Sequence, residues 1–311
     1  MAMAVGNDSN FLEMDVEEED FAAMRESVEL RHGLMFIIGT ISFFNLVNWI
    51  VKSYGPPKSL KDEEWKWRNL YVSWVHALIT SLWTLTCMIV YPEMFSSLLQ
   101  HVNYVTYFCV CFGTGYFFYD LLDLILNNKF FIMWEVVVHH IAYWVASMFY
   151  YNVHIRAHIG FNIIALSVEV NSFFLHWRKL LQMVKTPYDS PKYLAIKYLN
   201  LTTFIVFRGV PLSMITYCCF VWRHRVSAMY YVGICLSIFV MDVLNVILFW
   251  RLLKSDMLRG PEKKIGGLKT ESSAVCENLH SSNGKSSNGH VLVNGYKPSL
   301  KESNLLTKKE D

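Results

Sequence analysis

The sequence predicts an all-α polytopic membrane protein, and three observations support this prediction. Hydrophobic residues make up 53% of the 311 residues and charged residues only 17%, against about 25% charged residues in ordinary soluble domains. Seven apolar stretches follow one another, each near the roughly 20 residues that a helix needs to cross a bilayer. Tryptophan and tyrosine gather at the ends of these stretches, as expected where a helix meets the membrane surface.

The first predicted span, 34–51, is free of charge and precedes the others. The fifth is interrupted by several polar residues, among them Asn162 and Asn171. A bundle of six or seven helices is therefore expected. The other predicted spans are 70–91, 103–126, 133–151, 159–177, 199–222 and 228–250.

The two ends of the chain differ from its apolar middle. Residues 1–33 are acidic and lack the basic start and apolar centre of a signal peptide, so the span 34–51 is expected to insert as an uncleaved anchor. Residues 257–311 are rich in Ser, Asn, Gly and Lys. Such a composition buries too little apolar surface to fold, and we expect a disordered tail.

Basic residues predict the orientation of the spans. Lysine and arginine are several-fold more frequent near the span ends on the side of the C-terminus than on the opposite side. Because cytoplasmic loops carry the excess of positive charge, the C-terminus is expected in the cytoplasm and the N-terminus outside. Asn7, in the triplet Asn-Asp-Ser, is then a candidate for N-glycosylation. The net charge of +2 gives no indication of a nucleic-acid partner.

Ionisable side chains within apolar spans are costly, so they usually face the bundle interior and mark candidate functional positions. They also have a purely structural interpretation, because a buried pair such as Arg208 with Asp242 or Asp123 would lock helices together. The ionisable residues in the spans are His76, Asp120, Asp123, Glu135, His139, His140, Glu169, Arg208 and Asp242.

His139 and His140 are the candidate catalytic residues. Neighbouring residues on a helix point about 100° apart, so this pair is poorly arranged to chelate one metal, and one histidine is expected to act as a general base. Glu135 lies one turn before His139 and is expected to orient its ring. Glu169 or Asp123 is expected to accept a hydrogen bond from His140. The cysteines show no metal-ligand spacing, and no metal or other cofactor is expected.

Several motifs resemble the TLC domain family, which includes the ceramide synthases and several lipid-regulating membrane proteins. They follow the family's order within residues 62–256. The resemblance implies a six-helix domain over this range, with 34–51 as one additional helix in front. The motifs are WKWRNLYVSWVHALITSLWTL, CFGTGYFFYDLLDLI, WEVVVHH, VEVNSFFL and MDVLNVILFWRLLKSD.

The resemblance also implies what the histidines would do. In ceramide synthases a histidine pair and a following His-Asp-x-x-Asp stretch carry acyl transfer from acyl-CoA to a sphingoid amine. His139 and His140 match the pair, whereas Val168-Glu169 and Ser172 stand where the second stretch would lie. An activity of the ceramide synthase kind therefore lacks part of its pattern here.

The family members that these motifs resemble most are linked to phospholipid acyl composition at the plasma membrane. The resemblance therefore implies a plasma-membrane regulator of phospholipid acyl composition and fluidity that limits the incorporation of long polyunsaturated chains. Two alternatives stay open: an acyl-CoA-dependent acyltransferase, and a modulator of a membrane-protein partner such as an ion channel. The expected partners are membrane lipids, either phospholipids or acyl-CoA, and no nucleic acid.

Overall fold

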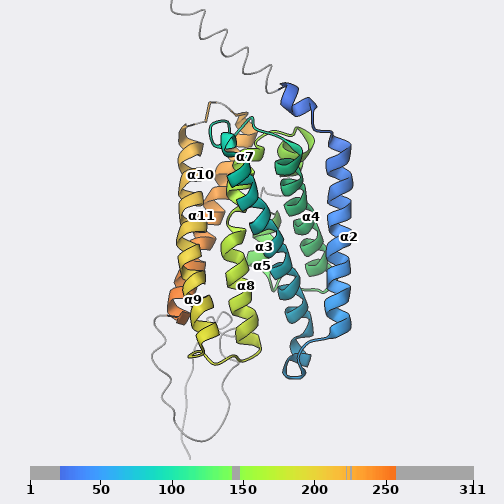
Figure 1. Ribbon diagram of the computed structural model, residues 1–311, viewed down its shortest axis with the longest axis vertical. Helices are drawn as coiled ribbons and strands as arrows, with labels where there is room; N and C mark the ends of the chain where they lie inside the picture. The colour runs from blue at the N-terminus through green and yellow to red at the C-terminus, as the bar shows by residue number, and fades with distance from the viewer. Residues whose placement is uncertain (1–21, 142–147, 222, 225, 257–311) are drawn as a thin grey trace, which may run out of the picture. The chain divides into compact units, whose positions relative to one another are not determined.

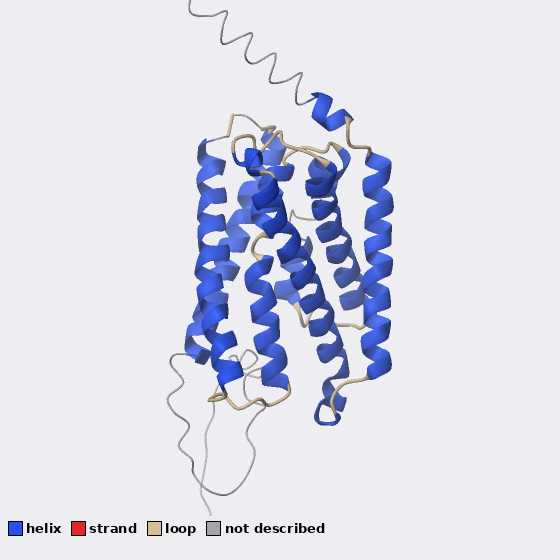
Figure 2. Ribbon diagram, in the orientation of Figure 1, coloured by secondary structure: helices blue, strands red, loops and turns tan. Residues whose placement is uncertain are grey.

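The computed structural model describes residues 22–141, 148–221, 223–224 and 226–256. Within these ranges the chain forms helices joined by short loops and contains no strand (Figures 1 and 2). The all-α prediction is confirmed. Asn7, most of the acidic N-terminal segment and the tail 257–311 lie outside the described residues, so the expectations for them stay predictions.

Six helical stretches in the described part of the chain are long and apolar enough to cross a membrane. This number agrees with the predicted six or seven spans, and the protein is a multi-pass membrane protein. The stretches are α2 (Leu30–Tyr54); η1 (Lys58–Glu63) with α3 (Glu64–Val90); α4 (Tyr104–Leu126); α7 (Ile159–Leu166) with α8 (Glu169–Met183); α9 (Pro191–Phe204) with η4 (Ile205–Gly209) and α10 (Val210–Val221); and α11 (Ala228–Asp256).

The fourth predicted span, 133–151, is not among these six. It begins with the short helix α5 (Trp134–Ile141) and ends within the π-helix η3 (Met148–His154). Residues 142–147 between them lie outside the described ranges. A seventh crossing at this place therefore stays a prediction. A short 3-10 helix, η2 (Pro92–Phe95), joins α3 to α4.

Local chemistry fixes several helix ends. Asn103 and Thr106 form a reciprocal capping box at the start of α4, which satisfies backbone N–H groups that have no partner within the helix. Ser190 accepts a hydrogen bond from the Tyr193 backbone N–H at the start of α9, and Pro191 occupies the first turn. This cap is why the helix begins well before the predicted position 199. Pro211 follows the π-turn η4, since a proline ring clashes with the carbonyl four residues earlier and disturbs the regular helix.

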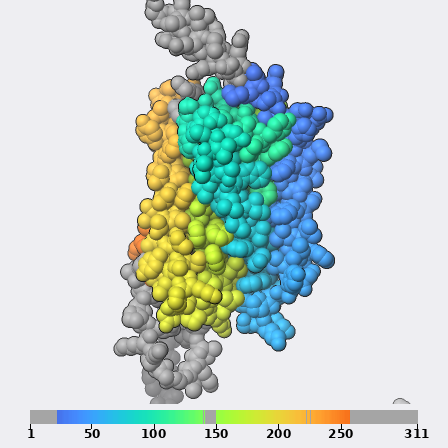
Figure 3. Space-filling model, in the orientation of Figure 1, coloured from blue at the N-terminus to red at the C-terminus, as the bar shows by residue number. Residues whose placement is uncertain are grey.

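Helices α4 and α7–α8 form the centre of the bundle. In the most apolar 18-residue stretch of each helix, 72% of the residues are buried in α4 and 78% in α7–α8. The corresponding shares are 22% for α2 and 28% for α11. Helix α3 lies against α4 and α8, and on the face seen in Figure 3 it runs between α2 and α8. Most of the exposed large apolar side chains lie on the outer helices α2, α9, α10 and α11, as expected for surfaces that face lipid.

Two glycines bring α2 close to α4 (Figure 1). A Cβ atom on Gly33 of α2 would lie 2.1 Å from the Tyr107 hydroxyl oxygen of α4. A Cβ on Gly115 of α4 would lie 2.7 Å from the Thr40 Cβ of α2. Small residues at such positions allow membrane helices to pack closely. The helix predicted to lead the domain is therefore packed tightly against it.

Candidate functional site

Helix α4 presents two aspartates to the interior. Asp120 and Asp123 lie three residues apart, hence on one face of the helix, and both are buried. The Asn69 side-chain amide donates to Asp120 Oδ1 at 2.8 Å, and the Trp65 indole N–H donates to Asp123 Oδ2 at 3.0 Å. Both carboxylates are therefore held by side chains of α3, as the cost of burying a charge requires.

The helix α5 brings His140 to the same place. Its Nδ1 lies 3.1 Å from Asp120 Oδ2, and both side chains are buried. The ring centroid of Phe117 lies 5.0 Å from that of His140. The carboxylate beside Nδ1 thus belongs to Asp120, which the packing of α5 on α4 brings near, and the expectation that Glu169 or Asp123 accepts a hydrogen bond from His140 stays a prediction.

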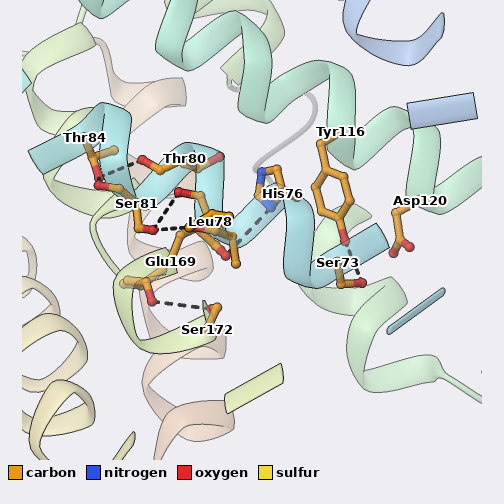
Figure 4. Close-up of polar contacts among 12 residues, drawn as sticks. Ser73, His76, Leu78, Thr80, Ser81, Thr84, Tyr116, Asp120, Glu169 and Ser172 are labelled. Carbon is orange, nitrogen blue, oxygen red and sulfur yellow. Dashed lines mark hydrogen bonds and ion pairs between the residues drawn. The ribbon is translucent and has the colours of Figure 1, made fainter. Parts of the chain in front are cut away.

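A second histidine lies beside a second carboxylate. His76 Nδ1 of α3 is 3.8 Å from Glu169 Oε2 at the start of α8. The His76 ring stacks on Tyr116, with centroids 3.7 Å apart and planes 10° apart, and the Tyr116 hydroxyl donates to Ser73 Oγ at 3.0 Å. Figure 4 shows His76 between Glu169 and Tyr116, with Asp120 beyond the tyrosine.

These two pairs form one arrangement, called here the histidine site and defined by His76, Glu169, Tyr116, Asp120 and His140. Tyr116 connects the pairs, because its ring stacks on His76 and meets the His140 ring edge-on at 6.3 Å. A carboxylate beside Nδ1 favours the tautomer that carries its hydrogen there and leaves Nε2 as a proton acceptor. In the described part of the chain, His76 Nε2 is buried and has no hydrogen-bond partner. The site can therefore accept a hydrogen bond or a proton.

A different cluster surrounds Arg208, and it is called here the arginine cluster. The guanidinium of Arg208 donates to Asn171 Oδ1 at 2.7 Å, to Asn245 Oδ1 at 2.8 Å and to Ser172 Oγ at 2.8 Å. All four side chains are buried, and they join α8, η4 and α11. The cluster holds three segments of the chain together through a charged donor and neutral acceptors.

The structural alternative, in which Arg208 pairs with Asp242 or Asp123, is not what the described residues show. Neither Asp242 nor Asp123 is among its partners: Asp242 accepts from the Thr216 hydroxyl at 3.4 Å, and Asp123 is bound by α3. Asp242 is thus separate from both clusters. Ser172, which stands where the resemblance would place an aspartate, is bound to Arg208.

Glu135 has a partner on another helix that the sequence did not indicate. The Glu135 carboxylate forms two hydrogen bonds with Arg251 of α11, at 2.8 and 2.9 Å. It therefore interacts with the guanidinium, and the expectation that it also orients the His139 ring stays a prediction. His139 lies in α5, but its side chain is outside the described part of the structure, so its catalytic role stays a prediction.

Sequence reasoning missed the polar face of α3 that completes the site. Four side chains follow one another at spacings of three or four residues, which places them on one side of a helix. They are Trp65, Asn69, Ser73 and His76. This periodic polar pattern was the available signal. Within the described residues, no group of three or more His, Cys, Asp or Glu side chains is arranged to hold a metal ion.

Comparison with known proteins places this geometry in a family. The model of the TLC domain family matches residues 66–254. TLC domain-containing protein 2 of Danio rerio is 32% identical over 237 residues, covering 76% of this chain and 95% of that protein. TLC domain-containing protein 1 of Homo sapiens is 31% identical over 195 residues, covering 62% of this chain and 76% of that protein. No solved structure matches the chain. The extent of these matches shows that the chain belongs to the TLC domain family.

Proposed function

We propose that the protein regulates the acyl composition of membrane phospholipids at the plasma membrane, and with it membrane fluidity, by limiting the incorporation of long polyunsaturated chains. The resemblance of its motifs to family members linked to this process supports that choice. The observation that carries the proposal is the buried contact between His140 and Asp120. This polar contact lies inside a membrane-spanning bundle, and the molecules that surround such a bundle are lipids.

The chemistry of the histidine site suits a lipid ligand with a polar group. Ionisable side chains in a membrane interior are costly, and they are typically found where a protein binds or moves a polar species. Glu169 lies beside His76 Nδ1, an arrangement that leaves His76 Nε2, which has no hydrogen-bond partner in the described structure, to accept from a hydroxyl group of a lipid. In the arginine cluster, by contrast, each of the three guanidinium nitrogens already donates to a side chain of the protein itself.

The test is phospholipid profiling of cells that lack the protein and are complemented with variants at matched expression. Wild-type protein is expected to lower the content of long polyunsaturated acyl chains, and His140→Gln is expected to lose that effect. Gln preserves hydrogen bonding but not basicity. His224→Gln is the matched control, because His224 is exposed and lies away from the site. Equal profiles for wild type and His140→Gln would refute the role of this histidine.

The same contact favours a second candidate, an acyl-CoA-dependent acyltransferase with His140 as general base. Ser172 counts against it, because it replaces an acidic residue of the ceramide synthase pattern and is bound to Arg208. Purified protein in lipid bilayers, supplied with labelled acyl-CoA, separates the two functions. Acyl transfer that is lost in His140→Gln would establish the enzyme, whereas lipid regulation without turnover would support the regulator.

The proposal includes the orientation inferred from the basic loops, with the N-terminus outside and the C-terminus in the cytoplasm. Tags at each end of the chain, probed with antibody on intact cells, test it. An N-terminal tag stained without permeabilisation is the expected result. A C-terminal tag stained under the same conditions would reverse the orientation.

A further inference from the structure

A groove lies between α2 and α4, and the ring of its lining residue Phe112, 6.0 Å from that of His76, borders the histidine site. The groove has a volume of about 490 Å³, within the range of about 300–1,000 Å³ that is typical of small-molecule sites. Helix α2 lies outside the residues that match the family model, so the groove exists because of a helix that precedes the matched domain. The lining residues are His32, Met35, Phe36, Gly39, Thr40, Phe43, Phe108 and Phe112.

The walls of the groove are apolar and fixed. Phe36 and Phe108 stack with their ring centroids 4.7 Å apart and their planes 12° apart, and Trp83 packs edge-on behind Phe36. The hydroxyl of Thr40 donates to the Phe36 backbone carbonyl at 2.8 Å, so its hydrogen is used within α2. The groove therefore presents rings and methyl groups, which suit a hydrocarbon chain.

Gly39 keeps the groove open. A Cβ atom at this position would meet nothing within 4 Å, whereas a Cβ at Gly33 on the same helix would collide with Tyr107. Close packing therefore explains why residue 33 is a glycine, but it does not explain the glycine at position 39. A glycine inside a helix costs about 1 kcal/mol relative to alanine. At position 39 the missing side chain leaves room for an occupant that is not part of the described protein.

The length and the polar end of the groove indicate its occupant. From His32 to Phe43 the helix rises about 16 Å, close to half of the roughly 30 Å hydrocarbon core of a bilayer. At the end near His32, the Tyr104 hydroxyl accepts from the Glu29 backbone N–H at 3.3 Å and lies 3.1 Å from His32 Nδ1. In the tautomer whose Nδ1 accepts the tyrosine hydrogen, His32 Nε2 carries the ring hydrogen and is an N–H donor.

We infer that the groove between α2 and α4 binds one acyl chain of a phospholipid from the leaflet on the N-terminal side of α2. The chain runs from His32 at the membrane surface to Phe43 near the midplane. The His32 N–H meets the ester or phosphate oxygens, which are hydrogen-bond acceptors. This inference rests on the proposed function for the choice of lipid class, and it adds a binding site separate from the histidine site.

The test uses the full-length protein in bilayer discs of phosphatidylcholine that include a photoreactive acyl chain. Adducts are mapped by mass spectrometry, and they are expected on Phe36, Phe43 and Phe108. Gly39→Phe fills the groove without a clash at its Cβ and should lose most of these adducts. Gly209→Phe is the control, because Gly209 is another exposed glycine with open space at its Cβ. The unfolding temperatures of both variants show whether each is folded.

Three outcomes would overturn the inference. They are the absence of adducts from the groove of the wild-type protein, unchanged adducts in Gly39→Phe, and labelling of the groove by a photoreactive sterol with which phospholipid does not compete. None of these depends on the cellular lipid profile. A groove that is labelled while His140→Gln leaves that profile unchanged would count against the proposed function alone, and an unlabelled groove with an altered profile would count against the groove alone.

Discussion

The arginine cluster and the histidine site are two buried polar groupings in one bundle, and they are built differently. Arg208 gives its hydrogens to two amides and a hydroxyl, all neutral and all within hydrogen-bonding distance. The histidine site relies on two carboxylates and leaves His76 Nε2 without a partner in the described structure. A satisfied cluster stabilises the fold, whereas an unsatisfied one retains the capacity to bind. This difference separates a helix lock from a candidate site.

The largest expected effect is on the arginine cluster. Arg208→Leu should destabilise the protein by roughly 3 kcal/mol or more, because three hydrogen bonds to a charged donor are lost, each worth about 1.5–3 kcal/mol. The measurement is the unfolding temperature in detergent together with the amount of folded protein. Arg208→Lys, which keeps the charge but not the three-way geometry, should recover only part of the loss. A stable Arg208→Leu variant with an altered lipid profile would make Arg208 part of the site.

A smaller loss of stability is expected at the histidine site. Asp120→Asn keeps the Oδ1 that accepts from Asn69 and changes the group beside His140. The expected cost is about 1 kcal/mol, near that of one ordinary hydrogen bond, together with a changed phospholipid profile. Asp123→Asn is the companion variant, since Asp123 is held by Trp65 and does not contact His140 in this way. Low abundance of Asp120→Asn with an unchanged lipid profile would make Asp120 a helix lock.

The stability of the protein is expected to fall in acid because of His158, a histidine outside both groupings. Burial lowers the pKa of His158 to about 4, against an unperturbed pKa of about 6.5. Between these values the unfolded chain binds the proton more readily, so stability is complete above about pH 6.5 and falls as the pH drops towards 4. The expected loss is about 1 kcal/mol between pH 7 and pH 5.5. His158→Asn should flatten this dependence in unfolding measurements, because asparagine does not titrate there and tolerates the positive φ of 61°.

The smallest effect on stability is expected at His76. His76→Phe keeps a ring to stack on Tyr116 and removes the unpaired Nε2, so the free energy of unfolding should change by less than about 1 kcal/mol. The lipid profile should nevertheless change if His76 serves the site. A large destabilisation would instead show that the contact with Glu169 is needed for folding, and the contrast between the two groupings would then weaken.

The sequence predicted which polar residues face the interior better than it predicted which residues they contact. Asp120 and Asp123 were expected on one helix face because their spacing is local, and both are buried there. The bond between Glu135 and Arg251 could not be predicted from such a local rule, because Arg251 approaches from a helix distant in the sequence. Two hydrogen bonds between full opposite charges make this a strong contact.

The sequence by itself determined the helical spans and the ionisable residues inside them. A bilayer interior offers no water to backbone groups, so a long apolar stretch that enters it must satisfy them within its own helix. The tertiary structure alone decided which polar residues meet. Crossings between α3, α4, α5 and α8 bring His140 to Asp120 and His76 to Glu169, and the packing of α2 on α4 creates the groove. These contacts depend on how helix surfaces fit together, which no local spacing in the chain records.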